Sequence, residues 1–202
     1  PSNGVNRTIF AMNQDVYAVP TSPAVPVSIS SAISSQATKV RFCQFNDDTM
    51  WVDGFNSSKK WDGTTVSDVS GMGINTLVMP WKQRIFKVPS SDPTRVEFSG
   101  LNDPTAYRPV DFFYVPGPKS PDHISGWRIF QDNLVIFTHE TKHIITGSDI
   151  STFQRTEAVG TKGAVSDEAM AVDRNYIFFM ADDGLIYKFN GVSDENVSEK
   201  IE

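Results

Sequence analysis

The feature that most constrains the fold of this chain is a hairpin unit that recurs along it. Each unit has a short run of β-branched and aromatic residues, a polar turn, a second such run and a closing glycine. Four units fit this description: Thr49–Gly63, Arg84–Gly100, Leu134–Gly147 and Tyr176–Gly191. Their closing glycines are therefore 37, 47 and 44 residues apart. A weaker first copy, "TIFAMNQDVYAVP" from Thr8, lies about one period earlier.

The length of this repeat indicates one architecture above others. A period of roughly 40 to 45 residues with several short strands is typical of a β-propeller blade. The stretches between the hairpins, "ATKVRFCQF", "GINTLVMPW", "ISGWRIFQ" and "EAMAVDR", supply the remaining strands. Stacked blades bury both faces of each sheet, which explains apolar runs without alternation such as "YIFF" and "LVIF".

The sequence therefore predicts an all-β fold, a β-propeller-like array of four to five short-stranded blades in a single domain over residues 1–202. A β-sandwich with irregular loops is the alternative. The best helix candidate, Val165–Val172, is short enough for one turn at most.

Two proline-rich segments interrupt the repeat. Val19–Gln36 is rich in Pro, Ser and Ala, and Leu101–His123 carries five prolines and the aromatic cluster Phe112–Tyr114. Long proline-rich loops are usually functional or interface-forming. We expect both segments to be long loops whose extended backbone is ordered by neighbouring subunits, with the aromatic cluster exposed.

One short motif suggests an enzyme. His139-Glu140-Thr141-Lys142-His143 matches H-E-x-x-H, which places two imidazoles on zinc in metalloproteases. That chemistry needs a helix, because only the 3.6-residue turn brings residues i and i+4 onto one face. Here the motif lies between two β-branched runs, with Glu140 and Thr141 at or near a turn. We therefore expect a β-hairpin and no metal site.

The remaining reactive groups have structural interpretations as well. "ADDGLIY" resembles the Asp-box turn of sialidase-type propellers through Asp183 and Gly184, but a tight hairpin turn explains it. The carboxylates that a glycosidase would pair are Asp47, Asp48, Asp182 and Asp183, which we expect in solvated turns. Cys43 lies in an alternating strand pattern and is interpreted as a buried structural thiol. The sequence predicts no catalytic, cofactor-binding or metal-binding residue, and no cofactor.

The charge of the chain restricts its partners. The net charge is −6 and the pI is near 5.0, whereas binding to nucleic-acid phosphates needs clustered Lys and Arg. An acidic wall suits a channel past which DNA slides without sticking. The sequence has no apolar run of about eighteen residues, so we expect no membrane span. The chain begins with Pro1, which is expected of a processed, renumbered or fragmentary sequence.

An ordered series of short elements resembles a known family. It runs from "WDGTTVSDVSG" through "QRIFKVPSSDPTRVEFSG", "NLVIFTHETKHIITG" and "TKGAVSDEAMAV" to "YIFFMADDGLIYKFNG", from Trp61 to Gly191. The series is similar to the propeller regions of tail proteins of tailed bacteriophages, the tubular nozzle or hub proteins of short-tailed virions. The first 48 residues have no match, and members of the family are usually longer.

This resemblance implies a virion component without enzymatic activity. Such proteins form homo-oligomeric rings, commonly hexameric, below the portal and adaptor proteins. The rings enclose the channel through which DNA leaves without specific binding. The alternative is a carbohydrate-binding or carbohydrate-active propeller, in which exposed aromatic side chains stack on sugar rings. Those side chains would be Trp51, Trp81, Tyr107 and Tyr114.

Overall fold

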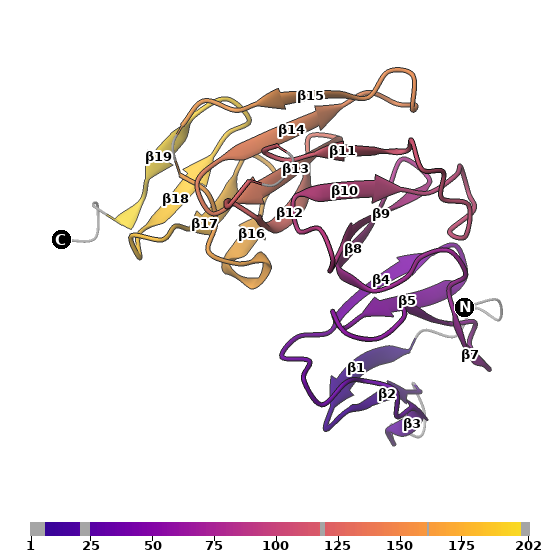
Figure 1. Cartoon of the computed structure of the whole chain (residues 1–202). Helices are drawn as coiled ribbons and strands as arrows, with labels where there is room; N and C mark the ends of the chain where they lie inside the picture. The colour runs from indigo at the N-terminus through magenta and orange to yellow at the C-terminus, as the bar shows by residue number, and fades with distance from the viewer. Residues whose placement is uncertain (1–6, 21–24, 118–119, 161, 199–202) are drawn as a thin grey trace. The chain divides into compact units, whose positions relative to one another are not determined.

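A computed structural model describes residues 7–20, 25–117, 120–160 and 162–198. Its described part contains nineteen short strands and one 3-10 turn, η1 (Asp167–Ala169), which agrees with the single helical turn expected in Val165–Val172. The strands form one three-stranded and four four-stranded sheets, in which neighbours along the chain are neighbours in the sheet (Figure 1). This all-β array of blade-like sheets confirms the predicted fold class.

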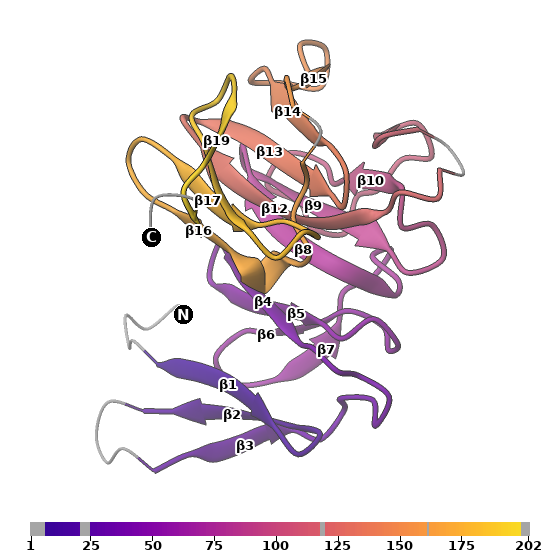
Figure 2. The same ribbon diagram turned by 90° about the vertical axis from the view of Figure 1, so that its left-hand side faces the viewer.

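The five sheets are numbered in chain order. The first contains β1 (Thr8–Met12), β2 (Asp15–Val19) and β3 (Val27–Ser30) (Figure 2). The second contains β4 (Arg41–Phe45), β5 (Asp48–Val52), β6 (Lys59–Trp61) and β7 (Val66–Asp68). The third contains β8 (Asn75–Trp81), β9 (Arg84–Pro89), β10 (Arg95–Phe98) and β11 (Phe112–Tyr114). The fourth contains β12 (Ile124–Phe130), β13 (Asn133–Thr138), β14 (Lys142–Thr146) and β15 (Gln154–Glu157). The fifth contains β16 (Met170–Val172), β17 (Ile177–Met180), β18 (Ile186–Phe189) and β19 (Asp194–Asn196).

Turn chemistry explains why these residues pair as hairpins. The first two strands of sheets one to four are joined by two-residue connections, for example Gln131-Asp132 between β12 and β13. Both residues of that connection have positive φ, as do Asn13-Gln14 and Lys82-Gln83. Two positive φ values in a two-residue loop give the turn whose twist matches that of the flanking strands.

The repeated glycines have a common structural position. Each lies just beyond the third strand of its sheet. Gly63, Gly100 and Gly191 are two residues beyond β6, β10 and β18, and Gly147 directly follows β14. Gly63, Gly147 and Gly191 have positive φ values, in which a side chain would be strained. The repeat found in the sequence is therefore the repeat of the sheets.

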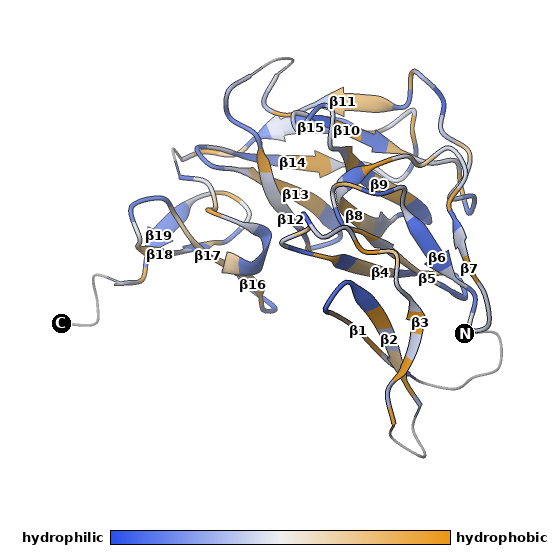
Figure 3. Cartoon of the chain, turned by 60° about the horizontal axis from the view of Figure 1, so that its bottom comes forward, coloured by the Kyte–Doolittle hydropathy of each residue, from blue (hydrophilic) through white to orange (hydrophobic). Residues whose placement is uncertain are grey.

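The chain forms two compact units, although the sequence is interpreted above as a single domain. One unit contains residues 1–92 and 96–112, and the other contains residues 93–95 and 113–202. In the first unit, Trp51 and Trp61 pack with Val16 and Ala18, and Met50 and Val52 pack with Val78 and Ile85. In the second unit, the core contains Phe130, Val135, Phe137, Ile177, Phe179 and Phe189. Strand β13, mostly orange in Figure 3, is the hydrophobic centre of its sheet.

The two proline-rich segments are not long loops throughout, which corrects the expectation from the sequence. Strand β3 lies within Val19–Gln36 and pairs with β2, and β11 lies within Leu101–His123. Both are edge strands, where proline and its neighbours are tolerated. Residues 21–24 and 118–119 of these segments lie outside the described residues.

Hydrogen bonds within the chain hold both segments. The Ser34 N–H donates to Asp53 (2.9 Å), and the side-chain amide of Asn56 donates to the Ala32 carbonyl (2.9 Å). The Gly100 N–H donates to the Ala106 carbonyl (2.7 Å). The cluster Phe112–Tyr114 is half-buried, not exposed. The described parts of both segments therefore have hydrogen-bond partners within the chain.

Among the described residues, no helix has the length and apolar character that crossing a membrane requires.

Candidate functional site

The H-E-x-x-H residues lie on a β-hairpin. His143 belongs to β14, opposite Ile136 of β13, whereas His139 lies in the turn that follows β13. The His143 side chain is buried and its Nε2 lies 3.0 Å from the Thr141 hydroxyl, while His139 is exposed. Burial lowers the pKa of His143, and the nearby Arg155 lowers it further, so the ring is neutral at physiological pH. The described residues contain no group of three or more His, Cys, Asp or Glu side chains placed to bind a metal ion.

We expect purified protein to carry well below one zinc ion per chain, because one imidazole is buried within a sheet and the other is exposed. Elemental analysis of dialysed protein tests this expectation. His139→Ala should change neither the metal content nor the folding. Stoichiometric zinc that is lost in both His139→Ala and His143→Ala would contradict the hairpin interpretation.

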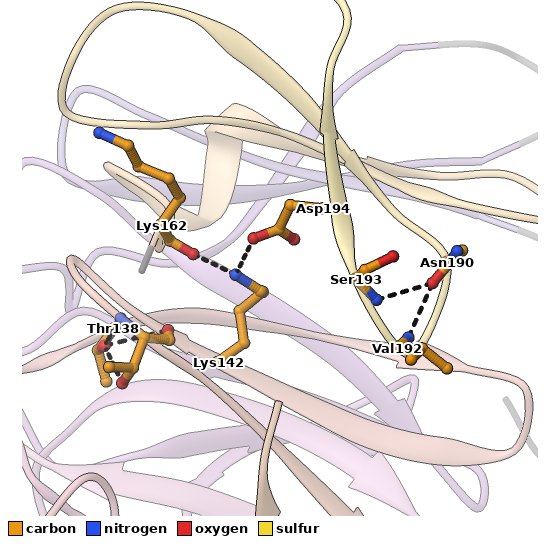
Figure 4. A network of polar contacts seen from close by, with 8 residues as sticks. Thr138, Lys142, Lys162, Asn190, Val192, Ser193 and Asp194 are labelled. Carbon is orange, nitrogen blue, oxygen red and sulfur yellow. Dashed lines mark hydrogen bonds and ion pairs between the residues drawn. The ribbon is translucent and has the colours of Figure 1, made fainter. Parts of the chain in front are cut away.

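The residue between the two histidines has an unusual environment. Lys142 has a fully buried side chain, and its Nζ lies 2.6 Å from a carboxylate oxygen of Asp194, a residue of β19 whose side chain is 10% exposed (Figure 4). The Lys142 ammonium also donates to the Lys162 carbonyl and lies 5.2 Å and 5.7 Å from the ring centres of Phe179 and Phe189. A buried lysine thus joins the fourth sheet to the fifth.

Electrostatics make this bridge sensitive to the removal of either partner. Burial lowers the pKa of Lys142 and raises that of Asp194, and in each case the opposite charge offsets part of the shift. The second Asp194 oxygen is buried without a hydrogen-bond partner among the described residues. A charge left alone here would be costly, because it would be buried without a counter-charge.

The backbone around the bridge is closely packed. Gly160 has φ +122°, and a Cβ there would overlap the Asp194 carboxylate. The Ala158 N–H donates to the Lys142 carbonyl (2.8 Å), which holds the segment after β15 beside β14. The bridge is a buried structural contact, since the Lys142 Nζ faces a backbone carbonyl, a carboxylate and two phenyl rings.

A second ionic contact joins the same two sheets. The Arg128 guanidinium on β12 donates to a carboxylate oxygen of Asp167 (2.7 Å) and to the Met170 carbonyl (3.0 Å). Asp167 also accepts the Trp127 N–H (3.2 Å). Because Asp167 begins the η1 turn before β16, this contact fixes the point at which the chain enters the fifth sheet.

The Asp-Gly turn of "ADDGLIY" is a structural turn, as expected. Asp183 accepts hydrogen bonds from the Leu185 N–H (3.0 Å) and the Tyr187 hydroxyl (2.8 Å), and Lys162 lies 2.8 Å away. Asp182 is 3.7 Å from the same lysine. In the other unit, Asp48 pairs with Lys60 at 2.8 Å. These carboxylates therefore have structural partners.

We expect Lys162→Ala to raise the pKa of Asp183. Lys162 is the main cause of its low value, about 2, followed by the Leu185 N–H and the Tyr187 hydroxyl. Since the folded pKa is below the ordinary 3.8, the contact stabilises the fold above about pH 4, and its contribution is lost as the pH falls through about 2. Carboxyl-carbon NMR titration measures the shift. Lys60→Ala is the control, and an unchanged Asp183 pKa in Lys162→Ala would contradict this assignment.

A hollow of about 620 Å³ lies in the first unit, lined by Arg7, Ile9, Gln44, Asn46, Asp47, Thr49, Trp61 and Gly63. Its polar groups mostly contact one another. The Arg7 guanidinium donates to the Gly63 carbonyl (3.2 Å) and lies over the Trp61 ring, 5.1 Å from its centre. The Thr49 hydroxyl donates to Gln44 (3.0 Å). This arrangement ties the first sheet to the second and leaves Trp61 buried.

The aromatic surface expected for sugar stacking is largely absent from the described part of the chain. Trp51 and Trp81 are buried, with 2% and 4% of their surface exposed, and Tyr107 and Tyr114 are half-buried. The sequence could not predict their burial, because a local pattern does not show which neighbour covers a side chain. Cys43 lies on β4 as expected, but it is half-buried and not fully buried. The surrounding protein raises the pKa of its thiol to about 12, so the thiolate is not populated at neutral pH.

Comparisons with known proteins identify the fold. No protein-family model and no curated protein sequence matches the chain. Among solved structures, it is similar to BamB from Moraxella catarrhalis, with 12% identity, a TM-score of 0.61 and coverage of 96% of this chain and 56% of that one. PorZ, a surface component of the type-IX secretion system of Porphyromonas gingivalis, gives 9% identity, a TM-score of 0.62 and coverage of 95% and 27%. YCF48 from Cyanidioschyzon merolae gives 10% identity, a TM-score of 0.54, and coverage of 93% of this chain and 70% of that one.

These neighbours are β-propellers of varied function. Identities this low show a shared fold and nothing about activity. The chain spans 56% of the length of BamB and 27% of that of PorZ.

Proposed function

We propose that the chain is a structural, non-enzymatic component of a bacteriophage tail, part of a nozzle or hub ring around the DNA exit channel. The observation that carries the proposal is the placement of the ordered motifs that resemble such proteins. Trp61-Asp62-Gly63 ends the third strand of the second sheet, "FSG" ends the corresponding strand of the third, and "ITG" that of the fourth. The motifs thus recur at one position in successive sheets, as expected of a structural repeat.

The contacts of the charged side chains support a structural role. The groups that suggest catalysis are used within hairpins or between sheets: His143 contacts Thr141, Lys142 binds Asp194, and Asp183 holds its own turn. Catalytic groups normally converge on an accessible site, where perturbed pKa values serve proton transfer or nucleophilic attack. Lys142 and Asp194, whose pKa values are shifted by burial, instead pair with one another, and the Lys142 ammonium lies over two phenyl rings.

The proposed partners follow from this role. A nozzle component assembles as a homo-oligomeric ring, hexameric in the family that the sequence resembles, and contacts portal, adaptor or other tail proteins. DNA passes the ring without specific binding, which suits a chain of net charge −6. We expect no measurable binding of a duplex oligonucleotide at physiological ionic strength.

The protein composition of purified virions tests the proposal directly. Particles purified from cells that carry the coding sequence should contain peptides of this chain, and antibodies against the purified protein should label the tail in immunogold electron microscopy. An antibody against the major capsid protein serves as the positive control for accessibility. Absence of the peptides from intact virions would overturn the tail assignment. Strong, competable binding on a glycan array, together with that absence, would favour the carbohydrate-binding alternative.

A further inference from the structure

The first sheet has one covered face and one open apolar face. The register of β1 and β2 places Ile9, Ala11, Val16 and Ala18 on one face, where they pack with Trp51 and Trp61 of the second sheet. The opposite face carries four apolar or aromatic residues, Phe10, Met12, Tyr17 and Val19, flanked at its ends by the polar Thr8 and Asp15. Phe10 and Tyr17 stack with ring centres 5.3 Å apart, and Met12 is 53% exposed. This set of four residues is called the head face (Figure 2 shows its sheet).

The fifth sheet has the same asymmetry. Ile177, Phe179 and Phe189 pack on Phe137 and Val135 of the fourth sheet. The opposite face carries four apolar residues, Ala171, Phe178, Met180 and Ile186, since Ala171 pairs with Phe178 and Met180 pairs with Ile186. The ion pair of Lys188 and Glu195 lies beside them on the same face. Met180 and Ile186 are 41% and 40% exposed, and the face contains a hollow of about 230 Å³. These four residues are called the tail face.

Both faces have the composition of the covered ones. Along β17, residues 177–180 are "IFFM", so apolar side chains point to both sides of the strand. A strand with one solvated face alternates apolar and polar residues, whereas a strand between two packed layers is apolar throughout. The tail face therefore has the composition of a surface that another sheet covers, and so does the head face.

We propose that the head face of one copy of this chain docks on the tail face of a second copy, as a sheet-on-sheet contact like those within each copy. A second copy supplies both the missing layer and its complementary surface. The chain covers 56% of the length of the β-propeller BamB, so two copies together approach the length of one such propeller. The inference rests on the two faces and is independent of the proposed tail role.

The contact is heterologous, because two different faces meet. Strands of four or five residues at about 3.3 Å per residue give faces roughly 15 Å long, at the small end of specific interfaces. We therefore expect association that depends on concentration, with dissociation in the micromolar range.

Mixing of single-face variants tests the proposal. Met12→Glu places a charge on the head face and Met180→Glu places one on the tail face. Sedimentation velocity over a range of concentrations should show association of the unmodified chain and at least a tenfold weakening for each variant alone. An equimolar mixture of the two variants should recover association, because each contributes its intact face. Val110→Glu and Val192→Glu, at positions 74% and 68% exposed but outside both faces, are the matched controls.

Three results would overturn the proposal. The first is an unmodified chain that remains monomeric up to about 1 mM, as expected if a further segment of a longer polypeptide covers the tail face. The second is association that neither Met12→Glu nor Met180→Glu weakens while circular dichroism shows both folded. The third is weakening by both variants without recovery in the mixture, which indicates like-with-like contacts.

Discussion

Lys142→Ala is expected to lower the free energy of unfolding by about 3–5 kcal/mol, because it leaves the Asp194 carboxylate buried without its counter-charge. Asp194 is 10% exposed, and one of its oxygens already lacks a hydrogen-bond partner among the described residues. The substitution also removes the cation–π contacts of the lysine ammonium with Phe179 and Phe189. Urea denaturation followed by tryptophan fluorescence measures the change.

Two further variants separate the burial of charge from general damage. Lys142→Met combined with Asp194→Leu removes both charges and should recover most of the lost stability, since an apolar pair of similar volume is often neutral or better. Lys188→Ala breaks the partly exposed pair with Glu195, 2.9 Å apart, and should lower the free energy of unfolding far less than Lys142→Ala does. Equal losses in Lys142→Ala and the double variant would show that the charges do not matter.

Gly163→Ala is expected to cost about 3 kcal/mol, because the new Cβ has no space. It would overlap the carbonyl oxygen of Thr138 and lie 2.6 Å from the carbonyl carbon of His139. Both neighbours are backbone atoms of the hairpin between β13 and β14. The Gly163 N–H donates to the His139 carbonyl (3.2 Å) and the Ala164 N–H to the Thr138 carbonyl (2.9 Å), so relief of the overlap breaks hydrogen bonds.

Gly117→Ala is the matched control, because a Cβ there meets nothing within 4 Å. It should leave the thermal midpoint nearly unchanged or slightly raised, since alanine restricts the unfolded chain. Thermal unfolding of both variants by circular dichroism provides the comparison. A Gly163→Ala variant as stable as Gly117→Ala would mean that Gly163 and Ala164 do not pack against the hairpin in solution.

Local chemistry explains which parts of the fold could be predicted from the sequence. The third-strand glycines at 63, 147 and 191 adopt positive φ, and the hairpin that carries His139 and His143 forms where two β-branched runs flank polar residues. Both features depend on residues close together in the chain, for which turn preferences and side-chain alternation are sufficient. The same reasoning excluded a zinc-binding helix at the H-E-x-x-H motif.

The exposure of individual side chains was beyond such reasoning. Trp51 and Trp81 were candidates for an exposed sugar-binding surface, yet both are buried. Val19–Gln36 was expected to be a loop, yet Val27–Ser30 pairs with β2 as an edge strand. A local pattern states that a residue is apolar or a segment extended, but it does not state which neighbour covers it.

The sequence by itself determined the strands, their hairpins and the period of the repeat, because short-range turn geometry and the two-residue alternation of a strand are encoded locally. The buried ion pair of Lys142 is apparent only in the tertiary structure, because its partner Asp194 is 52 residues away and belongs to another sheet. The tertiary structure also decided which faces of the first and fifth sheets are covered and which stay open. Burial and ion pairing depend on contacts between residues far apart in the chain, and such contacts exist only once sheets pack on sheets.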